Sequence, residues 1–77
     1  MKYFFDILSG QLETRDEEGC ELENEAEMRK EAIRLLAQIV SDEAPYGNAP
    51  VLATRVRDKT GRPVWCAVLS IEGQRLQ

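Results

Sequence analysis

A single segment of this chain has a helical pattern, and strand-like segments lie on both sides of it. Asn24 is a favourable N-cap, and Glu27 can complete a capping box with it. Because the residue before Pro45 is disfavoured in the α region, we expect a helix over about residues 25–43. Its apolar residues recur at three- and four-residue spacing: Met28, Ala32, Leu35, Leu36, Ile39 and Val40, with Ile33 and Ala37 widening the stripe. One helix with one apolar stripe needs a sheet to pack on.

Two pairs of strands are predicted around this helix. Residues 3–8 are aromatic and β-branched, and a Ser-Gly turn leads into a weaker, polar strand over residues 11–15. Residues 51–57 and 64–71 form the second pair, joined by an Asp-x-x-Gly turn. The expected fold is therefore α+β with a ββαββ order: an antiparallel sheet of two hairpins, with the helix packed on one face, in a single domain over residues 1–77. The order of the strands within the sheet stays open.

The first and last strands are apolar on both faces, although one helix can cover only one face of a sheet. A strand that is buried on both sides has this pattern. We therefore expect the sheet face opposite the helix to be an interaction surface, formed by Phe4, Leu8, Val64, Cys66 and Val68. A second copy of the chain or another protein is the expected partner.

No set of residues in the sequence predicts catalysis, a metal site or a cofactor site. The chain has no histidine and only two cysteines, too few for a structural zinc site. The phosphate-binding loop that would give an Asp-x-x-Gly turn a role in nucleotide hydrolysis is missing. We expect a non-enzymatic protein without a cofactor or small-molecule substrate.

The sequence also predicts a cytoplasmic protein. Asp6 interrupts the N-terminal apolar run before it reaches the length of a signal-peptide core. No uncharged run approaches the ~20 residues of a membrane span. Cys20 and Cys66 are accordingly expected as reduced thiols, with Cys20, just past a turn, the more accessible of the two.

Charge is distributed unevenly along the chain, whose net charge is −4. Residues 1–27 contain nine acids and two bases, a net charge of −7, whereas residues 28–77 contain five acids and eight bases, a net charge of +3. The simplest interpretation is that the two parts pair with each other. The alternative is a nucleic-acid accessory protein whose basic hairpin binds phosphates, through Arg55, Arg57, Lys59 and Arg62.

Three stretches of the sequence resemble a family of small stand-alone bacterial domains of unknown function, found in rhizobia and related proteobacteria. They are Tyr3-Phe4-Phe5-Asp6, the Asp-Glu-Glu-Gly turn with Cys-Glu-Leu after it (residues 16–22), and Arg-Asp-Lys-Thr-Gly-Arg-Pro-Val (residues 57–64). The resemblance implies a cytoplasmic bacterial protein that is a single domain, and it supplies no catalytic or binding residues. Glu23 stands where the family usually has a proline.

Overall fold

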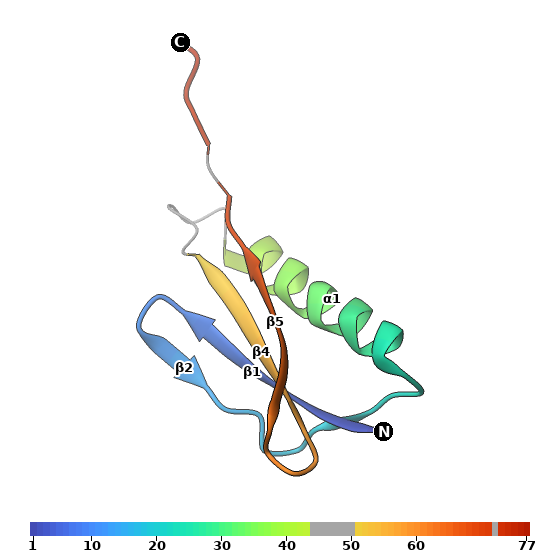
Figure 1. Ribbon diagram of the computed structural model, residues 1–77. Helices are drawn as coiled ribbons and strands as arrows, with labels where there is room; N and C mark the ends of the chain where they lie inside the picture. Colours follow the sequence, from blue (N-terminus) through green and yellow to red (C-terminus); the bar gives the residue numbers. More distant parts are fainter. Residues whose placement is uncertain (44–50, 72) are drawn as a thin grey trace.

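Helix α1 (Glu25–Glu43) packs on one face of an antiparallel sheet in the computed structural model, which describes residues 1–43, 51–71 and 73–77 (Figure 1). The five strands are β1 (Lys2–Ser9), β2 (Leu12–Thr14), β3 (Cys20–Glu21), β4 (Leu52–Asp58) and β5 (Pro63–Leu69). The α+β class, the ββαββ order and the helix limits are as predicted. The short strand β3 is an addition. Residues 46–50, whose glycine, asparagine and proline predict a connecting loop, lie outside the described residues.

The N-terminus of α1 is held by the predicted cap. The Asn24 side chain accepts a hydrogen bond from the Glu27 amide at 2.9 Å, which satisfies one of the free amides of the first turn. One turn further on, Arg29 forms an ion pair with Glu25 at 2.9 Å. Because Glu25 precedes Arg29 by four residues, the charges also suit the helix dipole.

The core lies between α1 and the sheet. Met28, Ala32 and Leu36 are the fully buried helix residues, and they repeat every four positions as an inward stripe does. The sheet supplies the opposite side of the core with Tyr3, Phe5, Leu52, Thr54 and Val56. The stripe is narrower than predicted. Ile33 (59% exposed) and Ala37 face away from the sheet, because a single sheet covers only one side of the helix.

The strand order is β2-β1-β4-β5, and β3 extends the β2 side by pairing with the start of β1. The two long strands β1 and β4 are therefore central, and β5 is an edge strand. β5 ends at Leu69, which pairs with Leu52, the first residue of β4. The predicted strand to residue 71 is too long, because β4 offers no partner beyond that pair; Ile71 is exposed.

The two faces of the sheet differ in chemistry. Because side chains alternate along a strand, the register places one set of residues opposite the helix, and we call this side the open face. Its cross-strand rows are Leu8–Ala53–Val68, Asp6–Arg55–Cys66 and Phe4–Arg57. The open face thus combines a polar centre with apolar residues toward its margins.

Candidate functional site

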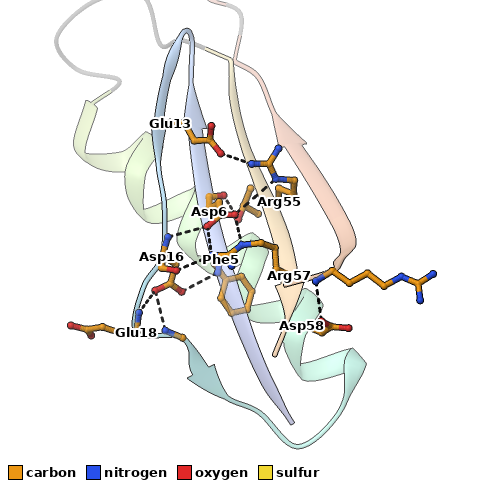
Figure 2. A network of polar contacts seen from close by, with 11 residues as sticks. Phe5, Asp6, Glu13, Asp16, Glu18, Arg55, Arg57 and Asp58 are labelled. Carbon is orange, nitrogen blue, oxygen red and sulfur yellow. Dashed lines mark hydrogen bonds and ion pairs between the residues drawn. The ribbon is translucent and has the colours of Figure 1, made fainter. Parts of the chain in front are cut away.

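The centre of the open face is a buried ion pair between β1 and β4. Asp6 has no exposed surface and Arg57 is 7% exposed. Arg57 donates two hydrogen bonds to the Asp6 carboxylate, from Nε at 2.7 Å and from Nη2 at 2.9 Å (Figure 2). This bidentate geometry is the strongest form of an arginine–carboxylate contact. The guanidinium also lies over the ring of Phe4, and its central carbon, Cζ, is 5.0 Å from the centre of that ring.

A second carboxylate, that of Asp16, fixes the segment between β2 and β3 to this pair. Asp16 accepts a hydrogen bond from the Phe5 amide at 2.9 Å, and its own amide donates to Asp6 at 2.9 Å. Its backbone carbonyl accepts from Arg57 at 2.8 Å. Phe5 lies where neither β2 nor β3 pairs with β1. The Asp16 carboxylate therefore supplies the hydrogen-bond acceptor that the carbonyl of a neighbouring strand would otherwise supply to the Phe5 amide.

Arg55 completes the network toward β2. It forms an ion pair with Glu13, and its Nε lies 3.9 Å from the Asp6 carboxylate. Two arginines of β4 thus face two acids of the N-terminal hairpin. The predicted pairing between the acidic and basic parts of the chain is present here, since Asp6 and Glu13 neutralise the two arginines. The Asp16 carboxylate adds one further negative charge, which backbone amides hold. Of the predicted basic set, Lys59 and Arg62 are exposed at the β4–β5 turn.

The network holds its carboxylates in the ionised form. The hydrogen bonds from Arg57 lower the pKa of Asp6, outweighing the opposing effect of burial. Burial alone would raise the pKa of Asp16, but hydrogen bonds from the amides of Phe5, Gly19 and Glu18 lower it. The same ion pair raises the pKa of Arg57. Hydrogen bonds to the charged form of a group stabilise that form. Asp6, Asp16 and Arg57 are therefore held in their ionised forms by the network.

Four of the five predicted interface residues share the open face. Val68 is 66% exposed and Cys66 is exposed, whereas Phe4 and Leu8 are half-buried. Val64 is apart from them. It is the extra residue of a bulge, since Val56 pairs with Trp65 and Arg57 pairs with Pro63. Val64 lines a hollow at the end of the sheet together with Tyr3 and Met28 of the core.

The expected accessibility of the two cysteines is reversed. Cys20 is partly buried and packs against the core, whereas Cys66 is exposed. Cys20 lies on β3 opposite Tyr3, which places it under the helix side of the sheet. Cys66 points to the open face, where the described residues do not cover it.

Sequence reasoning missed the polar centre of the site. In the sequence Asp6 is an interruption of an apolar run, and a charged residue inside a strand that is apolar on both sides is a candidate for a buried ion pair. Among the described residues, no group of three or more potential metal ligands is present. Within the same residues, no helix is long and apolar enough to cross a membrane.

These features define a small α+β domain with one helix-covered face and one open face. A family model described as "Domain of unknown function (DUF6894)" matches residues 2–70. The chain belongs to this family, in agreement with the resemblance to a small domain of unknown function. Comparisons with curated proteins and with solved structures find no match.

Proposed function

We propose that this chain is a non-enzymatic interaction module that associates with a second copy of itself, using the open face of its sheet. The observation that carries the proposal is the exposed apolar margin of that face. Val68 is 66% exposed beside Ala53 and Leu8, and Cys66 is exposed one row away. Contiguous exposed apolar residues typically mark a protein interface. A small domain also gains stability from an added subunit.

The state of the two network carboxylates, buried Asp6 and half-buried Asp16, supports an interaction role over catalysis. Asp6 and Asp16 accept several hydrogen bonds each, and their pKa values are lowered. A general acid or base works best with a pKa near the working pH, and these groups are moved away from it. The network stiffens the face on which a partner would bind.

Nucleic-acid binding by the basic hairpin receives less support. Arg55 and Arg57 are paired with Glu13 and Asp6, so binding a phosphate would require breaking a network that is largely buried. Lys59 and Arg62 alone would provide two charges on a domain whose net charge is −4. Nucleic-acid-binding domains usually have the opposite net charge.

Sedimentation equilibrium at micromolar concentration tests the proposal. We expect the wild-type chain to be a dimer, and Val68→Asp to weaken the association about tenfold or more, because it places a carboxylate in an apolar contact. Ile33→Asp is the matched control. Ile33 is 59% exposed on the helix, and the substitution adds the same charge away from the open face. A monomeric wild-type chain, or equal effects of the two variants, would contradict the proposal.

A further inference from the structure

Strand β5 is a free and uncharged edge of the sheet. In the described part of the chain it pairs with β4 alone, and its seven residues, Pro63–Leu69, include no charged side chain. The backbone N–H and C=O groups along such an edge form a ready template for another strand. Natural proteins usually protect such edges with charges, bulges, short strands or a covering segment.

The opposite edge of the same sheet is protected in several of these ways. Its strands are short: β2 has three residues and β3 has two. Between them, Asp16 takes the hydrogen bond of the Phe5 amide, and charged Glu13 and Glu21 lie on the two strands. The β5 edge has a proline and a bulge only at its start, at Pro63 and Val64. The chain therefore closes one edge of its sheet and leaves most of the other available.

We propose that β5 pairs in antiparallel orientation with β5 of a second copy, about a two-fold axis at Cys66. This inference rests on the proposed self-association and places the contact at the β5 edge of the open face, so that the two open faces lie side by side in one sheet. Cys66 is the middle residue of Pro63–Leu69, so pairing about it extends equally far in both directions and ends at Pro63, which has no N–H to donate. The occupant of the edge must be an extended chain, because backbone groups are what the edge presents. The exposed side chains of Val68 and Cys66 belong to this edge strand.

The sequence of β5 favours a second copy over an unrelated segment. About this axis Cys66 lies opposite Cys66, and Trp65 lies opposite Ala67 of the second copy, so that a large side chain is next to a small one. Like charges directly opposite each other would destabilise a symmetric strand pair, and β5 has no charged side chain to bring together. Both helices lie on the same side of the combined sheet, and the Val68 and Cys66 residues of the two copies adjoin on its open face.

The protected edge determines the size of the assembly. A two-fold contact uses the same surface on both copies and closes on itself. After β5 has paired, the outer edges of the combined sheet are those of β2 and β3, which are only three and two residues long, and Asp16 occupies the gap between them by accepting the Phe5 amide. Such short, interrupted edges disfavour the addition of a further strand. The product is a dimer with one continuous sheet.

Disulfide cross-linking of the full chain tests the register. Residues directly opposite each other in an antiparallel pair have Cα atoms about 4.5–5.5 Å apart, within the range of about 4.4–6.8 Å that a disulfide spans. Diamide removes one hydrogen from each of two thiols and leaves one disulfide. We expect rapid formation of a covalent dimer by Cys20→Ser, which retains Cys66, and none by Cys66→Ser, which retains Cys20.

Amide hydrogen exchange provides a second readout that does not depend on cysteine chemistry. Alternate amides among residues 64–68 point away from β4. If β5 pairs with β5, these amides become protected from exchange with solvent as the protein concentration rises through the dissociation constant of the dimer. Contact between the open faces alone would leave these amides unprotected. Cys66→Lys should weaken the dimer by more than tenfold, because the two ammonium groups would adjoin at the axis, while Ile33→Lys should not.

The outcomes separate the inference from the proposed function. A dimer that forms the Cys66 disulfide and protects β5 supports both. A dimer that is insensitive to Cys66→Lys and leaves the β5 amides unprotected overturns strand pairing and leaves self-association standing. A strict monomer at micromolar concentration overturns both.

Discussion

Asp6 and Arg57 show how much one pair of residues contributes when it is buried. Asp6→Asn leaves the Arg57 guanidinium buried without its counter-charge, which typically costs about 3–5 kcal/mol. A domain of this size has a free energy of unfolding of only about 5–15 kcal/mol. We therefore expect Asp6→Asn to lower the urea midpoint strongly or to prevent folding.

Glu13→Gln is the matched control for this substitution. Glu13 pairs with Arg55, but its side chain is 47% exposed, and exposed ion pairs contribute less than about 1 kcal/mol. The same acid-to-amide change should therefore have little effect there. Equal losses in the two variants would show that burial of the Asp6–Arg57 pair does not determine its contribution.

The lowered pKa values of Asp6 and Asp16 predict how stability depends on pH. Both acids bind protons more weakly in the folded state than in the unfolded chain, so their contribution is complete above the unfolded value of about 3.9. It is lost as the pH falls through the folded values. Glu31 and Asp58 act in the same direction, through hydrogen bonds from Arg34 and Thr60.

We expect the free energy of unfolding to change little between pH 7 and about pH 5 and to fall steeply below about pH 4. Urea titrations at several pH values measure it. A stability that declines between pH 7 and pH 5, or that stays constant to pH 2.5, would contradict the assignment to these carboxylates.

At the scale of the elements, the N-terminus of α1 depends on one side chain. Asn24→Ala removes the hydrogen bond to the Glu27 amide and should cost about 1 kcal/mol. In a domain of this size that lowers the melting temperature by about 4–8 °C. Asn24→Asp keeps an acceptor at the cap and should restore most of the loss. Thermal unfolding followed by circular dichroism distinguishes the two variants.

The elements that sequence predicts well are those with local causes. The limits of α1 follow from Asn24, its apolar repeat and the proline after its end, all of which lie within a few residues of the helix. At β3 the sequence predicts only a short extended segment with Cys20 and Leu22 on one face, and not a strand of the sheet, because a two-residue strand has no periodicity and exists only through its pairing with β1. The role of Asp16 depends on a contact with Phe5, eleven positions away, which no local pattern contains.

The open face shows the same division. The alternation in β1 and β5 correctly indicated a second face with apolar residues, including Val68 and Cys66. The displacement of Val64 depends on a bulge against β4, and the polar centre depends on the register between β1 and β4. Both are products of long-range pairing, so the pattern of a single strand does not encode them.

Across the whole molecule, the arginines of the open face are paired with acids, and β5 contains no charged residue. The net charge of −4 therefore acts on self-association only over long range. Two such domains with charge centres roughly 25 Å apart repel each other by about 1 kcal/mol at 0.01 M salt and by much less at 0.15 M, where the screening length is about 8 Å. The dimer should accordingly become about fivefold tighter over this range of salt.

This salt dependence separates the two candidate functions by its sign. Binding of nucleic acid by Lys and Arg weakens steeply as salt rises, because counterions are released, whereas association of two acidic domains through an uncharged strand strengthens. Sedimentation equilibrium of the wild-type chain at 0.01 M and 0.15 M salt measures the second effect, and a gel shift with DNA and RNA at the lower salt measures the first. A dimer that weakens with salt would show that ion pairs between the copies, rather than the uncharged β5 edge, hold it together.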